Sequence, residues 1–428
     1  MKYSPRYRLF PDEQQREQLS WTLDVVRQVY NDALKRFNEV PESVGTVNQR
    51  VRSVRDKLPS MKDWWDDLND VYSTVLQNVV MRIERNVTNL GKLKEQGYGV
   101  GELRWKAPRD FRSFTYNKKG FELDKKSGPS GRGMLTLKKV AGQNIKVPIR
   151  LHRDLPDHES IKQLTVKQEP TGAWYVSYTI ETEEPAKPAP ENIDADDCVG
   201  IDLGILTFIH DSDGREIDRL DLSDDRERLE REQRALSRKQ HGSNNWEKQR
   251  QSVAEVHATM SNKKRDFKHK LAHFYTTAYD AVFFEDLNVT GLMQGVGNAR
   301  NTAEVGWRDL ITIFEHHGQK NGCHVETVDP TGTTKQCASC GVSTEKPLWV
   351  REHSCPVCGF TADRDLNAAA NVLKRGLEQL GVVHSEETPV KTATAVSADG
   401  GNASVAVDAS RVTEAGSAVL KETASAVE

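Results

Sequence analysis

Four cysteines constrain this 428-residue chain more than any other feature of its sequence. They form two Cys-x-x-Cys pairs, Cys337 with Cys340 and Cys355 with Cys358, and fourteen residues separate the pairs. Two such pairs supply four soft thiolates at a spacing that suits tetrahedral Zn²⁺, and four thiolates leave no position for water. We therefore expect a structural zinc site. His353 lies close enough to Cys355 to compete as a ligand.

The other two cysteines, Cys198 and Cys323, lie alone in apolar runs. This distribution is typical of a reducing cytoplasm and does not suggest a disulfide framework. No run approaches the roughly 18 apolar residues of a membrane span, and the N-terminal segment lacks the apolar stretch of a signal peptide. We therefore expect a cytoplasmic protein with no membrane partner.

The net charge of −3 hides a strong segregation of charge along the chain. Residues 101–150 hold 13 Lys and Arg against 4 Asp and Glu, and residues 263–270, "KKRDFKHK", hold five basic residues in eight. The last 48 residues, from Gly381, hold 3 basic residues against 7 acidic ones. Basic blocks are solvated faces in many proteins, and nucleic-acid phosphates are their other common partner. Charge alone leaves both interpretations open.

The spacing of apolar residues divides the chain into segments of different type. A short strand opens the chain, and helices with an apolar stripe follow from Asp12 and over about 70–95. Between 99 and 183 the apolar period becomes two, which predicts a small antiparallel barrel or sandwich. After a Pro- and Asp-rich linker, apolar strands alternate with long helices, as in an α/β domain. From residue 381 the chain has no Phe, Trp or Tyr, which predicts disorder.

One stretch within the strand-rich segment mixes aromatic and basic residues. "WKAPRDFRSFTYNKKGF" (105–121) contains Trp105, Phe111, Phe114 and Tyr116 among five Lys and Arg. Aromatic rings stack on bases and cations meet phosphates, so the mixture fits a nucleic-acid surface. Alternation of the same residues also fits half-buried strands, and both interpretations stay open.

Three acidic residues occupy comparable positions in the C-terminal half. Asp202 and Glu285 each end an apolar strand, and Asp365 precedes the Ala-rich helix "LNAAANVLKRGLEQL". A single acid at such a position is most often a turn or helix-cap residue, and Asp363 or Asp365 could serve as an N-cap. Three acids brought together at one edge of an α/β domain could instead hold two Mg²⁺ about 4 Å apart, the arrangement that cleaves phosphodiesters.

Three motifs in fixed order carry a resemblance to a known family. "GIDLG", "FFEDLNVTGL" and "CPVCGFTADRDLNAAANVL", arranged around the cysteines, resemble the split active site of a RuvC-type nuclease. The match is most specific to the TnpB family of transposon-encoded RNA-guided DNA endonucleases, which is related to the compact type V CRISPR effectors. The resemblance covers roughly residues 1–380, and the acidic tail is similar to that of haloarchaeal members.

The resemblance implies a multidomain α+β fold, in which a helical bundle interrupts a β-barrel and an RNase H-like α/β nuclease domain carries an inserted zinc ribbon. The implied domains are a wedge-like β-barrel at 1–10 and 99–185, a helical recognition domain at 11–98, a linker at 186–196, a RuvC-like nuclease domain at 197–328 and 363–380, a zinc ribbon that binds target nucleic acid at 329–362, and a disordered tail at 381–428.

The resemblance also implies the site and its partners. It assigns Asp202, Glu285 and Asp365 as catalytic ligands of Mg²⁺, using the second aspartate of "DRD", although spacing alone does not exclude Asp363. It implies a guide RNA encoded by the transposon end, a double-stranded DNA target cut next to a short adjacent motif, and a nucleoid-associated location.

Two alternatives belong to other functional classes. The first is a nuclease-inactive, RNA-guided DNA-binding regulator, whose mark would be the replacement of a catalytic acid. The second is a guide-independent, structure-specific nuclease or transposase accessory protein, which would not need the long N-terminal half. All three acids and the N-terminal half are present, so both alternatives rank below the RNA-guided endonuclease.

Overall fold

The computed structural model describes residues 1–428 except 127, 129–131, 154, 156–159, 205–206, 288–305, 348, 383–405 and 408–428. Contacts divide the chain into two compact units, Met1–Thr182 with Ala235–Glu255, and Glu183–Arg234 with Val256–Glu428. Mixed α and β structure, a nearly closed barrel-like sheet and a four-cysteine cluster confirm the expected fold class. The finer domain boundaries stay a prediction, and the tail expected to be disordered lies almost entirely outside the described residues.

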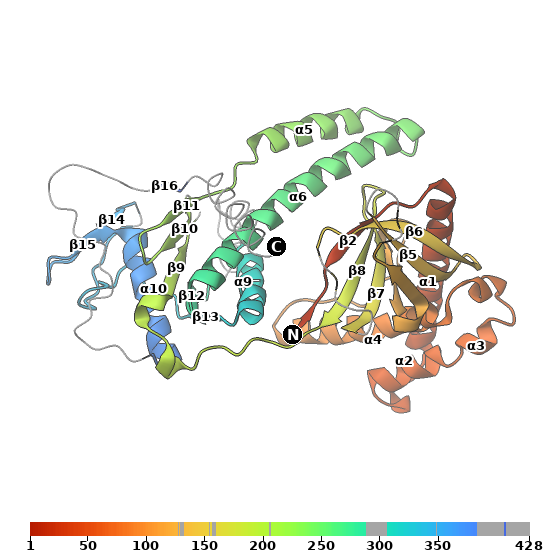
Figure 1. Ribbon diagram of the computed structural model, residues 1–428, viewed down its shortest axis with the longest axis horizontal. Coiled ribbons are helices and arrows are strands. Elements are labelled where there is room, and N and C mark those ends of the chain that lie inside the picture. The colour runs from red at the N-terminus through yellow and green to blue at the C-terminus, as the bar shows by residue number, and fades with distance from the viewer. Residues whose placement is uncertain are drawn as a thin grey trace. The chain divides into compact units, whose positions relative to one another are not determined.

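The first unit is built on an eight-stranded antiparallel sheet with the order β3-β7-β8-β2-β6-β5-β4, and β1 pairs with β8 (Figure 1). The N-terminal strand β2 lies between β8 and β6, so the opening strand pairs with strands that follow the helical insertion. The strands are β1 (Lys2–Tyr3), β2 (Arg6–Leu9), β3 (Ser113–Asn117), β4 (Phe121–Asp124), β5 (Gly133–Val140), β6 (Gln143–Arg150), β7 (Ile161–Gln168) and β8 (Trp174–Glu181).

Helices inserted between β2 and β3 complete this unit. They are α1 (Glu13–Glu39), α2 (Val47–Arg55), α3 (Leu58–Met61) and α4 (Ser73–Glu95). The α1 helix begins with a capping box in which the Asp12 carboxylate accepts from the Gln15 backbone N–H at 2.8 Å. The apolar stripes predicted for α1 and α4 are buried and join the core of the sheet.

The structure decides between the two interpretations of residues 105–121. Phe111, Phe114 and Tyr116 are buried in the core, so three of the four aromatic rings are packing residues of half-buried strands. Only Trp105, which is 65% exposed, stays available for stacking on a base. The nucleic-acid interpretation is therefore wrong for those three residues, and the half-buried strands indicated by their alternation are confirmed.

The second unit contains a six-stranded sheet with the order β13-β12-β9-β10-β11-β16. Strands β9, β12 and β13 are parallel, whereas β10 runs antiparallel to β9 and to β11. The strands are β9 (Cys198–Leu203), β10 (Thr207–Asp211), β11 (Glu216–Asp218), β12 (Ala281–Glu285), β13 (His324–Val328) and β16 (Ala406–Val407). The helices α9 (Trp307–Asn321) and α10 (Arg364–Leu380) belong wholly to this unit, whereas α5 (Ser223–Ser237) and α6 (Asn244–Ala278) each belong partly to the first unit.

Helix α10 packs directly on β9 and β12, and two glycines make this close approach possible (Figure 1). A Cβ atom at Gly200 would lie 2.3 Å from the Ala369 carbonyl oxygen, and one at Gly376 would lie 2.1 Å from Cγ of Phe283. Neither position tolerates a side chain without a shift of backbone or ring. These two close contacts therefore fix the position of α10 on the sheet.

A small ribbon precedes α10, formed by the antiparallel strands β14 (Glu352–Ser354) and β15 (Thr361–Asp363). Strand β15 ends at Asp363 and α10 begins at the next residue, so the cysteine-bearing segment leads into the helix without a loop. Among the described residues, no helix combines the length and apolar character that crossing a bilayer requires.

Candidate active site and cysteine cluster

The first two predicted acids lie side by side at the ends of neighbouring strands. Strands β9 and β12 are buried along their whole length and pair in parallel with Ile201 opposite Phe284. The next residue on each strand is Asp202 and Glu285, so both carboxyl groups are delivered to the same edge of the sheet. Each side chain is buried, and burying a charged carboxylate is costly unless a partner or a cation compensates it.

Helix α10 brings the third acid to this edge. Because Ala369 lies over Gly200, one helical turn toward the N-terminus places Asp365 near the end of β9. Asp365 is buried, whereas Asp363 is exposed and acts as the N-cap, accepting from the Asp365 backbone N–H at 2.8 Å. The structure thus gives the two aspartates of the "DRD" triplet different environments, and Asp365 is the one that joins the acid cluster.

The cluster destabilises the charged forms of Asp202 and Glu285. Burial, and then repulsion from Glu285 and Asp365, raises the pKa of Asp202 well above its usual value. Burial also raises the pKa of Glu285, and Asp365 adds repulsion, against the lowering effects of Thr333 and Arg375. Buried carboxylates that repel one another form a set of hard oxygen donors that a divalent cation would stabilise.

Two arginines contact Asp365. Arg351 donates from Nη2 to Oδ2 of Asp365, and Arg364 donates from Nε to Oδ1 at 3.3 Å. Arg351 comes from the segment just before β14, so the cysteine-bearing segment contributes a positive charge to the acid cluster. The Arg351 side chain is 44% exposed, and it is free to leave Asp365 without disturbing a packed core.

A hydrogen-bond ladder on α10 holds the loop between β13 and the first cysteine. Asn371 donates from Nδ2 to the carbonyl oxygens of Thr333 and Gln336 at 2.9 and 2.7 Å, and Asn367, one turn earlier, donates to the same two oxygens. Thr333, only 2% exposed, donates its hydroxyl to Oε1 of Glu285. The loop that α10 clamps therefore fixes the orientation of a predicted catalytic acid.

His210 is a site residue that the sequence interpretation missed. It lies on β10 directly opposite Asp202 and is 5% exposed. Ligand atoms of His210, Asp363 and Asp365 lie within 4.8 Å of one another, whereas Asp202 and Glu285 fall outside this tight group. The only signal in the sequence was a polar residue at a buried position of "TFIHD", and its meaning depended on strand register.

The four cysteines converge as predicted. Their four Sγ atoms all lie within 4.8 Å of one another. The Sγ–Sγ distance is 3.7 Å between Cys337 and Cys358 and 3.5 Å between Cys340 and Cys355. Four thiolates about 2.3 Å from a tetrahedral Zn²⁺ would stand roughly 3.8 Å apart, so the donor set fits. His353 is not in this group, and its Nδ1 lies 3.1 Å from Nζ of Lys346.

Each pair of cysteines forms a tight turn. The backbone N–H of Gly341 donates to the Cys337 carbonyl at 2.8 Å, and that of Gly359 donates to the Cys355 carbonyl at 3.1 Å. Both glycines have positive φ angles, 76° and 74°, which other residues adopt only with strain. Backbone N–H groups of Cys358 and Val357 lower the pKa of the Cys355 thiol to about 6, whereas burial raises the pKa of the Cys337 thiol, so the backbone favours the thiolate at one of the two turns.

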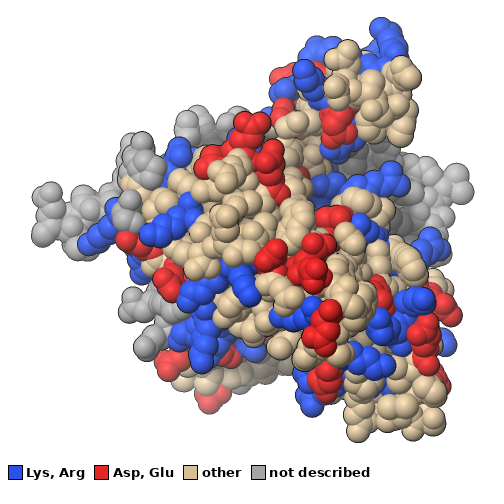
Figure 2. Space-filling model, turned by 90° about the vertical axis from the view of Figure 1, so that its right-hand side faces the viewer, with Lys and Arg blue, Asp and Glu red and all other residues tan. Residues whose placement is uncertain are grey.

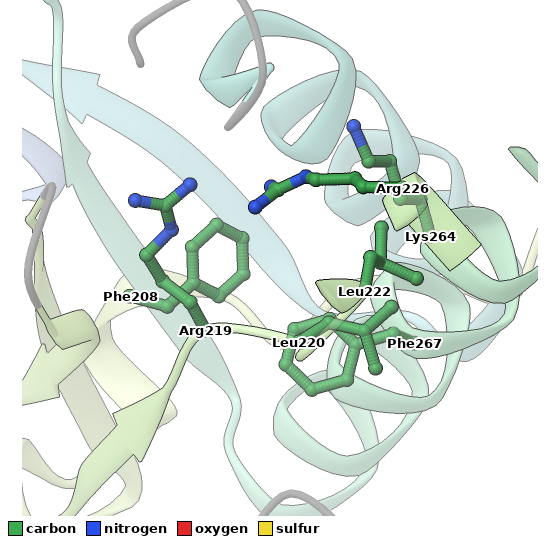
Figure 3. Close-up of a pocket in the computed structure, with 7 residues that line it drawn as sticks. All are labelled: Phe208, Arg219, Leu220, Leu222, Arg226, Lys264 and Phe267. Atoms are coloured by element: carbon green, nitrogen blue, oxygen red, sulfur yellow. The ribbon is translucent and has the colours of Figure 1, made fainter. Parts of the chain in front are cut away.

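The basic block at 263–270 is less solvated than its composition suggested. Lys263 pairs with Asp225 at 2.7 Å, and Lys268 is buried against Asp309 at 3.0 Å. Lys264 contributes to a crevice of about 40 Å³, and Figure 3 shows its ammonium group with the guanidinium groups of Arg219 and Arg226 on one side of apolar side chains. On the face drawn in Figure 2, basic and acidic side chains are interspersed.

A protein of Streptomyces pristinaespiralis named "Putative RNA-guided DNA endonuclease" is 32% identical over 385 residues, covering 88% of this chain and 90% of the relative. The chain belongs to the TnpB family. InsQ of Escherichia coli, which carries the same description, is 29% identical over 235 residues, and the match covers 57% of that TnpB relative.

Family models match three parts of this TnpB-family chain, and a solved structure shares its fold. Residues 175–295 match a family described as "Probable transposase", residues 307–372 match a "Cas12f1-like, TNB domain", and residues 1–42 match a "Helix-turn-helix domain". A cryo-EM structure of a Cas12f1–sgRNA–target DNA complex shares the fold, with a TM-score of 0.57 at 14% identity over 85% of this chain and 83% of that one.

Proposed function

We propose that this TnpB-family endonuclease cuts double-stranded DNA under the direction of a bound RNA, at a site next to a short adjacent motif. The catalytic ligands are Asp202, Glu285 and Asp365, and the metal is Mg²⁺. One observation carries the proposal: three buried acids from β9, β12 and α10 converge at one sheet edge, where burial and repulsion raise the pKa values of Asp202 and Glu285. Such a cluster is stable only when a cation or protons neutralise it.

Each residue has a separate task in this proposal. Bound Mg²⁺ would activate water and stabilise the leaving oxygen of the phosphodiester. Asp202, on a rigid buried strand, presents its carboxylate in one direction, and Thr333 holds Oε1 of Glu285. Arg351 and Arg364 donate to the two carboxylate oxygens of Asp365 and compensate its charge. The strands and the helix thus hold the oxygen donors close together in advance, although their charges repel one another.

The partners follow from the family. The proposed guide RNA comes from the transposon end, base pairing selects the DNA target, and the protein reads the adjacent motif and the shape of the duplex. The described relatives carry the name of RNA-guided DNA endonucleases, and the structural relative was solved with guide RNA and target DNA. The proposed role of the cysteine cluster is a structural Zn²⁺ that anchors the ribbon before α10.

Cleavage of a plasmid target by protein loaded with its copurified RNA tests the proposal. Asp202→Ala and Glu285→Ala should each abolish cleavage while the guide and target remain bound, because metal ligands act as a unit. Glu326→Ala, on the adjacent strand β13, is the matched control and should cleave normally. Full cleavage by either acid variant would remove the assigned site, and the absence of any specific RNA in the purified protein would remove the guided mechanism.

A further inference from the structure

His210 lies between two acids on the sheet. It is directly opposite Asp202 on β9 and directly opposite Glu216 on β11. Side chains of directly opposed residues stand on the same face of a sheet, so the imidazole lies in a row with two carboxyl groups. A buried histidine in such a row needs a partner for each of its two ring nitrogens, because a buried polar atom without a partner is unfavourable.

The two ring nitrogens of His210 have different surroundings. Nε2 lies 3.3 Å from Oε1 of Glu216, within reach for donating its proton. Nδ1 is buried without a hydrogen-bond partner, and it lies 3.9 Å from Oδ2 of Asp365, beyond hydrogen-bond distance. With the proton on Nε2, the lone pair of Nδ1 faces the oxygens of Asp365 and Asp363, an arrangement that is repulsive unless a cation lies between them.

This arrangement matches the way proteins prepare a histidine for a metal. A ligating imidazole characteristically donates its other N–H to a carboxylate, which fixes the tautomer and directs the free lone pair at the ion. Here Glu216 is placed to supply that carboxylate, and the free lone pair points to the group formed with Asp363 and Asp365. Arg351, which now contacts Asp365, is the neighbouring positive charge that a cation would replace.

We propose that His210 Nδ1, together with oxygens of Asp365 and Asp363, forms a mixed nitrogen and oxygen site for a divalent cation. The inference deepens the proposed function and rests on it, since Asp365 belongs to both sites. An imidazole ligand favours Mn²⁺ and later transition metals over Mg²⁺, which prefers oxygen donors alone. The protein therefore binds Mn²⁺ more tightly than a site of carboxylates alone would.

The competing explanation is an ordinary ion pair, in which an imidazolium would bridge Glu216 and Asp365. Spectroscopy separates the two explanations, because only a bound ligand couples its nitrogen nucleus to the unpaired electrons of Mn²⁺. The probe is Mn²⁺ added to the full chain, freed of RNA and loaded with zinc. Electron spin-echo envelope modulation should show ¹⁴N coupling from one imidazole.

Two variants at His210 make the test specific. His210→Leu removes the donor and should abolish the ¹⁴N coupling and weaken Mn²⁺ binding by about tenfold or more. His210→Asn places an oxygen near the position of Nδ1, so it should abolish the coupling while retaining binding and shifting the preference toward Mg²⁺. No ¹⁴N coupling in the native protein, or coupling that persists in His210→Leu, would overturn the inference.

Glu216→Gln tests the same site without touching the buried imidazole. It should keep the ¹⁴N coupling and lower Mn²⁺ affinity by about tenfold, whereas Asp218→Asn, the same charge change two residues further along β11, should leave the affinity unchanged. Equal affinity losses in both variants would reduce the effect to general charge and overturn the inference.

Failure of this inference and failure of the proposed function give different results. Mn²⁺ bound without ¹⁴N coupling, in a protein whose cleavage still needs Asp202 and Glu285, overturns the His210 ligand and leaves the proposed function intact. Mn²⁺ bound with ¹⁴N coupling, in a protein whose cleavage does not need those acids, supports the His210 site and overturns the proposed catalytic one.

Discussion

The cysteine cluster and the acid cluster are assembled in opposite ways. The cysteines span 337–358 and come from two tight turns, each closed by its own backbone hydrogen bonds and a glycine. The acids come from positions 202, 285 and 365, and only the packing of β9, β12 and α10 brings them together. One site is local in the sequence, and the other exists only in the tertiary structure.

The difference teaches how the two sites depend on each other. The loop from β13 to Cys337 carries Thr333, which holds Glu285, and β15 leads from the cysteines directly into the helix that carries Asp365. The cysteine cluster thus borders two of the three acids through short, hydrogen-bonded connections. A zinc-stabilised ribbon at this place would hold acids that repel each other, so the local site would support the non-local one.

The largest expected effect separates the two aspartates of the triplet. Asp365→Ala should lower the cleavage rate by on the order of 10³-fold or more, because a buried metal ligand is lost. Asp363→Ala should keep measurable cleavage, since its exposed carboxylate caps α10 and is not one of the three proposed catalytic ligands. Both variants are compared at equal concentrations of guide complex and target. An inactive Asp363→Ala beside an active Asp365→Ala would reverse the assignment.

The second effect tests the dependence of the acid site on the cysteine cluster. Cys355→Ser should lower the zinc content from about one ion per chain and reduce cleavage, because the ribbon would no longer hold Thr333 and Asp365 in place. Metal analysis and cleavage rates are measured on the same preparation. Cys198→Ser, at a buried cysteine outside the cluster, is the control and should keep its zinc. Full zinc content in Cys355→Ser would contradict the four-thiolate assignment.

The third effect concerns the contact between the two regions. Thr333→Val removes the hydroxyl that donates to Glu285 at nearly constant volume, and it should raise the Mg²⁺ concentration needed for half-maximal cleavage by about tenfold. Thr333→Ser retains the hydroxyl and should restore the native value. The zinc content should stay unchanged in both variants. If the Val and Ser variants need the same Mg²⁺ concentration for half-maximal cleavage, Thr333 contributes only by packing and not through its hydroxyl group.

The smallest expected effect is on the free energy of unfolding, and it measures the repulsion among the acids. Since folding raises the pKa values of Asp202 and Glu285, their contribution to stability is full at acidic pH and declines as pH rises through the raised values. Metal-free Asp202→Asn should therefore be more stable than the native protein at about pH 7, by about 1 kcal/mol, with a smaller difference near pH 4.

Denaturant unfolding without divalent metal at the two pH values checks this expectation, with Glu326→Gln as the charge-matched control on β13. Addition of Mg²⁺ should remove the advantage of Asp202→Asn, because the native acids then bind the cation. A native protein that is as stable as Asp202→Asn at both pH values would show that the carboxyl groups do not repel one another in the folded state.

Sequence reasoning succeeded where the determining contacts are short in range. The cysteine pairs with their glycines, the α1 and α4 stripes, and the apolar strands that carry Asp202 and Glu285 could all be recognised as local patterns, although β9 continues one residue beyond Asp202. It failed where one pattern serves two environments. Phe114 and Tyr116 alternate with polar residues because they line a strand, and that spacing cannot distinguish a ring turned to the core from one turned to a nucleic acid.

The sequence by itself determined the donor atoms of this protein: four thiolates at zinc spacing and acids at the ends of apolar elements. Only the tertiary structure decided which acid of the triplet is buried, that Thr333 holds Glu285, and that His210 lies opposite Asp202. The physical reason is strand register and helix placement, which depend on contacts such as Gly200 against Ala369 between segments far apart in the chain.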